Sequence, residues 1–157
     1  MRYNLGVKYP RGQQERNGIM ENCIFCKIIA GSIPSTTVYE DKDFKAIMDI
    51  SPAAKGHIII LPKKHISNIY EMDDDIASKV LIVAKKIAAA IKDELQCPGL
   101  NILQNNGEAA GQTVFHYHMH LIPRNQGDKV KVTWEPGSYQ DGEAAQIAKA
   151  LEKRMLN

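Results

Sequence analysis

The sequence predicts an α+β domain, in which an antiparallel sheet of about five strands is combined with one long helix and one or two shorter helices. Strand-length apolar runs follow one another as hairpins or across long connections, without the β-α-β alternation that a parallel sheet requires. One long stretch, residues 73–95, instead repeats its apolar residues at the spacing of a helix. Together these observations favour a mixed fold built on an antiparallel sheet.

The expected strands are short apolar runs bounded by turn-forming residues. The first two form a hairpin around Asp41, Lys42 and Asp43, and the third is closed by Pro62. The last strand carries an alternating run that includes three histidines. In chain order, the five expected strands cover residues 36–40, 44–50, 57–61, 100–104 and 114–122.

Helices are expected before, between and after these strands. A short helix over 23–30 ends at Gly31, and the long helix over 73–95 begins with three aspartates, which suit the positive end of a helix. Pro98 and Gly99 are expected to end the long helix. A final amphipathic helix over 142–155 is expected to turn three apolar side chains inward, namely Ile147, Leu151 and Met155.

Composition and charge limit the number of domains, the classes of partner and the cellular compartment that we expect. Its 157 residues suit one domain over 21–157, preceded by a polar tail over 1–20 that we expect to be disordered. The net charge of +2 gives no broad electrostatic case for nucleic acid or a membrane surface, and no apolar stretch approaches transmembrane length. Three cysteines, an odd number, indicate a reducing cytoplasm rather than a disulfide scaffold.

Three histidines alternate with apolar residues near the end of the expected sheet. His116, His118 and His120 share one face of a strand, and the intervening apolar side chains take the other. Alternate residues lie roughly 6.6 Å apart on a strand, so the three imidazoles of a straight strand are too widely spaced to grip one ion. At least one imidazole is therefore left for other chemistry, such as attack on phosphorus.

The loop before these histidines is rich in small residues. It covers 105–113 and contains Gly111, Gln112 and Thr113. Small residues let backbone N–H groups approach an anion closely, and the last two residues add side-chain donors, so the loop is a candidate phosphate cradle. The glycine patterns of P-loops and of dinucleotide-binding folds are both absent from the sequence.

These residues resemble the signature of the histidine triad (HIT) proteins, which are nucleotide hydrolases and transferases. The resemblance runs collinearly over about residues 21–127 and is strongest toward the small bacterial branch related to Hint-type phosphoramidases and diadenosine polyphosphate hydrolases. It implies the HIT fold, with two subunits that join their sheets across a homodimer. The matching segments are 24–29, 33–34, 48–52, 56–57, 61–65, Asn105, 111–113 and 116–122.

Cys23 and Cys26 have the spacing of a pair of metal ligands. A redox pair and two ordinary cysteines at a helix start are the alternatives, and the sequence alone does not say which histidines would complete a metal site. The resemblance implies that His65 and His116 do so. Four protein ligands would make a closed, structural zinc site.

The resemblance also implies a covalent mechanism. His118 is the expected nucleophile, oriented by the backbone carbonyl of His116, and it would form a nucleotidyl-histidine at the α-phosphate of a purine nucleotide conjugate, either a nucleoside phosphoramidate or a dinucleoside polyphosphate. His57 resembles a fourth active-site histidine. The expected donors to the phosphoryl oxygens are His120, Gly111, Gln112 and Thr113.

Nucleoside binding is assigned by resemblance as well. Asp49 resembles a carboxylate that binds ribose hydroxyls, and Asn105 resembles a polar residue that reaches the nucleotide or its loop. The expected base pocket consists of Phe25, Ile28, Ile47 and Ile50.

Two other hypotheses for the function remain open. One is a metal-dependent hydrolase or oxygenase that uses the histidine row as ligands. The other is a non-catalytic nucleotide sensor on the same fold.

Overall fold

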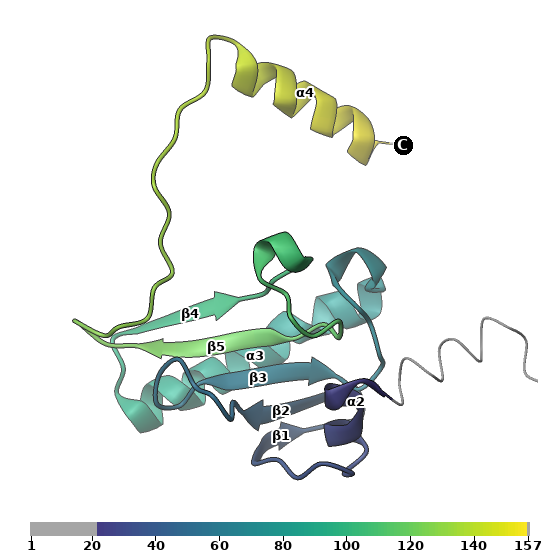
Figure 1. Cartoon of the computed structure of the whole chain (residues 1–157), viewed down its shortest axis with the longest axis vertical. Coiled ribbons are helices and arrows are strands. Elements are labelled where there is room, and N and C mark those ends of the chain that lie inside the picture. The colour runs from purple at the N-terminus through teal and green to yellow at the C-terminus, as the bar shows by residue number, and fades with distance from the viewer. Residues whose placement is uncertain (1–21, 157) are drawn as a thin grey trace, which may run out of the picture.

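The computed structural model describes residues 22–156, so the tail expected over 1–20 lies outside the described residues. The five expected strands form one antiparallel sheet in the order β1-β2-β3-β5-β4, which confirms the predicted fold class (Figure 1). Their bounds are Thr37–Glu40 for β1, Phe44–Met48 for β2, Ile58–Pro62 for β3, Gly99–Leu103 for β4 and Met119–Arg124 for β5.

The β1–β2 hairpin turns where the sequence predicts. The Asp41 carboxylate accepts hydrogen bonds from the N–H groups of Asp43 and Phe44, at 2.8 and 2.7 Å, so one side chain holds the turn closed. β2 ends at Met48, two residues earlier than predicted. The N–H of Asp49 still donates to the carbonyl of His57 at 3.0 Å, and the Asp49 carboxylate then closes a turn by accepting a hydrogen bond from the N–H of Ser51.

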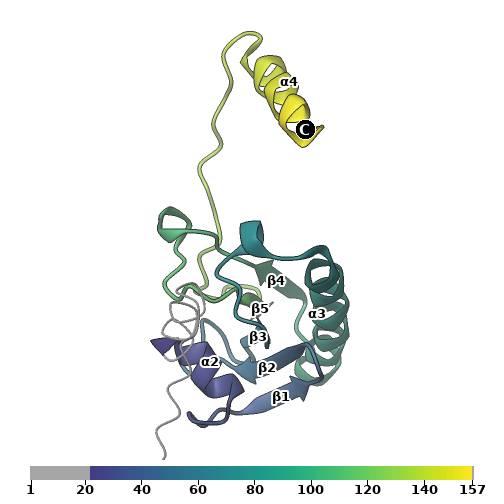
Figure 2. The same cartoon turned by 90° about the vertical axis from the view of Figure 1, so that its right-hand side faces the viewer.

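Helix α3, Asp74–Leu95, covers one face of the sheet (Figure 2). The Asp73 side chain caps its first turn by accepting a hydrogen bond from the N–H of Ile76 at 3.0 Å. The helix ends at Gln96 in the left-handed conformation, before the expected Pro98 and Gly99. Its buried side chains form the main core with β2, β3 and β5, and they are Ile76, Val80, Val83, Ala84, Ile87 and Ile91.

The opposite face of the sheet carries the short helix α2, Ile24–Ile29, so the sheet lies between two helices of very different length (Figure 2). A smaller apolar cluster joins α2 to this face, with Phe25 and Ile28 packed on Ile47, Ile59 and Leu61. β3 is buried along its whole length because both faces are covered. The candidate site lies on the α2 face.

The histidine segment is only partly a strand. The alternation correctly predicts the faces, since Tyr117, Met119 and Leu121 enter the main core opposite the imidazoles. However, β5 begins at Met119, and not at 114 as predicted. The N–H of Tyr117 bonds the carbonyl of Ile66, in the connection after β3, instead of a neighbouring strand, so residues 114–118 leave the ladder.

Helix α4, Glu143–Met155, is present as predicted, but the expectation that its apolar side chains point into the core is wrong for this chain. An extended segment carries α4 away from the sheet (Figure 1). Ile147, Leu151 and Met155 are 43, 57 and 77% exposed. Amphipathic spacing identifies a helix and its apolar face, but it does not identify what covers that face.

Two short 3-10 helices complete the described part of the chain. They are η1, Ile69–Glu71, which precedes α3, and η2, Glu108–Ala110, which lies in the loop before the histidine segment. Among residues 22–156, none of the helices is both long enough and apolar enough to cross a membrane.

Candidate functional site

A cavity of about 620 Å³ lies between α2 and the sheet. Its wall is mainly apolar, and the polar side chains that line it include His118, His120, Asp49 and Thr113. A volume in the range of roughly 300–1,000 Å³ with this balance is typical of small-molecule sites. The remaining lining residues are Ile24, Phe25, Ile28, Ile33, Pro34, Ser35, Thr36, Ile47, Met48, Ile50, Ile59 and Val114.

The His118 imidazole is held in one orientation beside this cavity. It is 7% exposed, and its Nδ1 lies 2.7 Å from the backbone carbonyl oxygen of His116. A carbonyl oxygen only accepts, so Nδ1 carries the proton and donates, and in the neutral ring Nε2 keeps a free lone pair. The ring of Phe25 lies 5.1 Å from the His118 ring, centre to centre, and limits its rotation. The Nδ1 contact thus leaves the Nε2 lone pair uncommitted, on a ring that lines the cavity.

A second chain of hydrogen bonds fixes the proton on His120. The N–H of Ala53 donates to Nδ1 of His57 at 3.1 Å, so the neutral His57 ring carries its proton on Nε2. That Nε2 donates to Nδ1 of His120 at 2.9 Å, which leaves the His120 proton on its own Nε2. The Asp49 carboxylate also approaches Nδ1 of His57, but at 3.5 Å, and the shorter Ala53 contact decides the tautomer. His120 is therefore a hydrogen-bond donor.

Burial keeps the two imidazole rings of this hydrogen-bond chain, His57 and His120, neutral. It lowers the pKa of His57, although the Asp49 carboxylate acts in the opposite direction. Burial also lowers the pKa of His120 to about 4, with further lowering from His118 and His57. Each ring is therefore uncharged near neutral pH, as the tautomer chain requires.

We expect the free energy of unfolding to fall as the pH is lowered from 7 to 5, partly through His57. Because the folded pKa of His57 lies below the unfolded value of about 6.5, the unfolded state binds more protons as the pH drops through that value. His57→Gln removes this titration, so urea denaturation should show a shallower decline for the variant. Equal declines in the two proteins would contradict a buried neutral imidazole.

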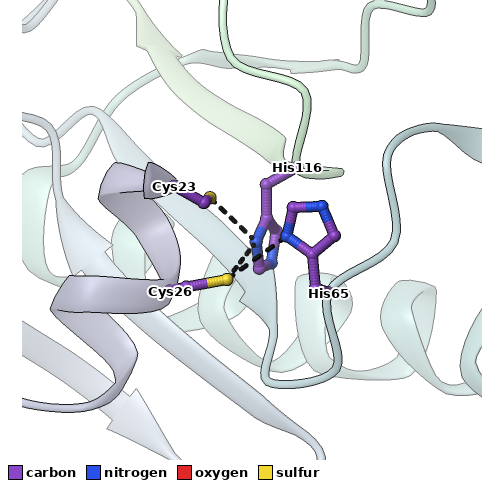
Figure 3. Close-up of side chains that lie close together, drawn as sticks. All are labelled: Cys23, Cys26, His65 and His116. Carbon is purple, nitrogen blue, oxygen red and sulfur yellow. Dashed lines mark hydrogen bonds between the residues drawn. The ribbon is translucent and has the colours of Figure 1, made fainter. Parts of the chain in front are cut away.

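The four predicted metal ligands come together next to the cavity. Cys23 and Cys26 come from the start of α2, His65 from the segment after β3 and His116 from the segment before β5 (Figure 3). Their donor atoms all lie within 4.8 Å of one another. Sequence spacing predicted the cysteine pair, and the fold brings the two distant histidines to it.

The distances within this cluster fit a tetrahedral zinc ion. Sγ of Cys26 lies 3.2 Å from Nδ1 of His65 and 3.5 Å from Nδ1 of His116, and Sγ of Cys23 lies 3.5 Å from the same His116 atom. Zn–S bonds of about 2.3 Å and Zn–N bonds of about 2.0–2.1 Å at the tetrahedral angle put sulfur and nitrogen about 3.5 Å apart. Two thiols and two imidazoles are also a donor set that zinc prefers.

The surroundings of the cluster support the same assignment. Nε2 of His116 donates to the carbonyl of Pro62 at 2.8 Å, which leaves Nδ1 bare toward the thiols, as metal-bound histidines are usually oriented. Burial lowers the pKa of His116 to about 4, so its Nδ1 is unprotonated and able to bind a metal at neutral pH. Burial, with the neighbouring Cys23, raises the pKa of Cys26 to about 12, so a zinc ion would have to displace the proton of that thiol. Nε2 of His65 is buried without a hydrogen-bond partner in the described part of the chain.

The loop over 105–113 is built differently from the expected phosphate cradle. The N–H groups of Gly111 and Gln112 donate to carbonyls of Glu108 and Gly107, at 2.8 and 3.0 Å. The Gln112 side chain is also committed, since it donates to two backbone carbonyls and accepts from the N–H of Gly107. These donors are therefore used to hold the loop, and Thr113 is the member of the run that lines the cavity.

The predicted nucleoside-binding residues lie mostly together. Phe25, Ile28, Ile47, Asp49 and Ile50 all line the cavity, although Ile50 is 98% exposed at its mouth. Asn105 does not line it and lies beside Gly111 within the loop.

Sequence reasoning missed some of the groups that shape this site. The segment 33–36 lines the cavity, and apart from the match of its Ile-Pro pair to the HIT signature the sequence gives no signal for this role. The N–H of Ala53 and the carbonyl of Pro62 set two imidazole orientations, but as backbone groups they leave no trace in the sequence.

Comparisons with known proteins agree with this geometry. A family model described as the HIT domain matches residues 30–127. A Bacillus subtilis relative named Protein hit is 50% identical over 140 residues, which cover 87% of this chain and 97% of that protein.

Two further matches bear on activity and metal content. Candida albicans HNT1, an adenosine 5'-monophosphoramidase, is 45% identical over 107 residues, which cover 66% of this chain and 70% of that protein. The crystal structure of a zinc-bound histidine triad family protein from Mycobacterium smegmatis has a TM-score of 0.68 and 35% identity, over 83% of this chain and 99% of that one.

Proposed function

This chain belongs to the histidine triad (HIT) family, and from that premise we propose that it is a nucleotide hydrolase that cleaves purine nucleotide conjugates at the α-phosphate through His118. The observation that carries the proposal is the His118 ring, whose Nδ1 is committed to the His116 carbonyl beside the cavity. The phosphoramidase activity named for the HNT1 relative supports the same chemistry. The substrates proposed are nucleoside phosphoramidates or dinucleoside polyphosphates.

The reaction proceeds in two displacements at phosphorus. Nε2 of His118 attacks the α-phosphorus, a P–N bond forms, and the bond to the leaving group breaks with its electron pair on the leaving group. The leaving group takes up a proton from solvent, and the attacking water of the second step returns one. Water then attacks the nucleotidyl-histidine, breaks the P–N bond and releases the nucleoside monophosphate. Dividing one hard displacement into two easier ones is the gain from covalent catalysis.

Two donors stabilise the charge that develops on the phosphoryl oxygens. Nε2–H of His120 is fixed as a donor through His57 and Ala53, and the hydroxyl of Thr113 reaches the same cavity. Removing one such preorganised donor typically costs about 10²–10³ in rate. Gly111 and Gln112 are left out of this role because their N–H groups are already bonded within the loop.

The rest of the cavity suits a purine nucleoside. Phe25, Ile28 and Ile47 supply an apolar wall for the base. The Asp49 carboxylate accepts from the N–H of Ser51 through one oxygen, and its other oxygen lies 3.5 Å from Nδ1 of His57. We assign this second oxygen the role of accepting from ribose hydroxyls.

We assign a structural zinc ion to Cys23, Cys26, His65 and His116. The zinc-bound relative and the ligand spacing support it. When bound, the ion would supply a cross-link between the start of α2 and the segments that flank β3 and β5. With four protein ligands it keeps no position for substrate.

A homodimer is also part of the proposal. The exposed apolar face of α4 and the outer edge of β4, which pairs only with β5 among the described strands, are surfaces that a second copy would cover. Sedimentation equilibrium should give twice the chain mass, and a monomer at micromolar concentration would contradict this.

The three free cysteines suit a cytoplasmic location.

One panel assay tests the function directly. Purified protein is incubated with an adenosine phosphoramidate, a diadenosine polyphosphate or an aminoacyl-adenylate, each with and without a chelator. We expect release of AMP from at least one of the first two, and activity that survives brief chelation, because no metal takes part in the displacement. Binding of the nucleotides without turnover would favour a sensor, and immediate loss of turnover on chelation would favour a metal-dependent hydrolase.

A further inference from the structure

Helix α2 borders both the metal cluster and the cavity. Cys23 and Cys26 face the cluster, and three other residues of the helix, Ile24, Phe25 and Ile28, line the cavity. The helix has only six residues, and its N-cap residue Cys23 makes no side-chain capping bond. Because so short a helix has little stability of its own, its position depends on its packing and on whatever holds the two thiols.

His116 forms a second connection between the two places. Its side chain belongs to the cluster, where it faces both thiols (Figure 3), and its backbone carbonyl orients the His118 ring. The ring of Phe25 contacts the rings of both histidines. Measured between ring centres, it lies 5.9 Å from His116 and 5.1 Å from His118. A shift of either α2 or His116 would therefore change the position of the His118 ring.

We propose that metal bound at the four-residue cluster and nucleotide bound in the cavity strengthen each other's binding, with Phe25 and His116 as the connections. This inference rests on the proposed function, because it takes zinc and a nucleotide as the two ligands. A ligand that orders α2 lowers the ordering cost for the other ligand, and such a coupling acts equally in both directions.

The coupling is measured as two affinities, each with and without the other ligand. Calorimetric titration of AMP into zinc-loaded and metal-free protein, both shown to be folded by circular dichroism, should give a dissociation constant about tenfold lower for the loaded form. Competition with a chromophoric chelator should show zinc bound tighter by the same factor in saturating AMP.

Two variants locate the connection. Phe25→Leu keeps an apolar side chain but removes the ring that touches both histidines, so the coupling should fall to about twofold or less, while zinc affinity without AMP stays within about twofold of the parent. Ile33→Val is the matched control, because Ile33 lines the same cavity from outside α2. It should keep the tenfold coupling whatever its AMP affinity.

The outcomes separate this inference from the proposed function. Equal AMP affinity in the loaded and metal-free forms would overturn the coupling and leave the proposed nucleotide site intact. Failure of AMP to bind either form would defeat the proposed nucleotide site, and the coupling with it. Full coupling in Phe25→Leu would overturn Phe25 as the connection.

Discussion

Replacing His118 with glycine should lower kcat for AMP release by at least about 10³-fold, since loss of a nucleophile in other enzymes costs about this much or more. Without Nε2 of His118, no covalent intermediate forms, and water must attack phosphorus in one step. Nucleotide binding should persist, because Asp49 and the apolar wall are untouched. Single-turnover kinetics and calorimetric binding measure the two effects separately.

Added imidazole provides the control for this variant. The glycine variant leaves room where the ring stood. Free imidazole at millimolar concentration should enter that space and attack phosphorus in place of the side chain, which would restore part of the rate. Rescue would show that the variant is folded and lacks only the imidazole. A variant that keeps more than a tenth of the parent kcat would remove His118 from the proposed role.

Removing zinc should lower the free energy of unfolding by about 4 kcal/mol when the reference contains free zinc at roughly 1,000 times its dissociation constant. The ion would bind a set of ligands that only the folded chain brings together, since 90 residues separate Cys26 from His116. Urea denaturation of the same protein with added zinc or with a chelator gives the difference.

The cysteines themselves supply matched variants. Cys26→Ser should abolish the zinc-dependent part of the stability, because oxygen replaces the half-buried sulfur that contacts both histidines. Cys97→Ser should retain it, since Cys97 is buried in the main core away from the cluster, even though the hydroxyl costs core stability. Identical stability of the parent with zinc and with chelator would contradict a structural metal.

Local patterns predicted most of the fold. The spacing from Ile76 to Ile91, with Asp73 at the start, locates α3, because a helix repeats its buried face every turn. The Asp41 turn locates the first hairpin, because one side chain closes the turn by bonding the backbone of its own neighbours. Information of this kind is short-range and can be read from a few residues.

Other features depend on tertiary partners that spacing does not reveal. The histidine segment alternates perfectly, but Tyr117 bonds Ile66 outside the ladder, so the strand begins later than the pattern indicates. Gly111 and Gln112 have the right types for phosphate donors, but the loop uses their N–H groups itself. The apolar residues of α4 are exposed and do not enter the core, because amphipathic spacing identifies an apolar face without identifying the surface that covers it.

The site divides in the same way. The Cys23–Cys26 spacing predicted half of a metal site, and the resemblance supplied His65 and His116, which the sheet then places within reach. The proton positions on His57 and His120 follow from the backbone of Ala53, which only the folded chain reveals.

Mass spectrometry of the enzyme during turnover tests whether His118 becomes covalently bonded to the nucleotide. Phosphorus–nitrogen bonds survive alkali, so an alkaline quench of enzyme mixed with adenosine phosphoramidate should trap one nucleotidyl group per chain, on the peptide that contains His118. We expect this adduct on His118 of the parent enzyme and its absence from the glycine variant. Turnover with no adduct at any quench time, or an adduct on another residue of the parent, would contradict it.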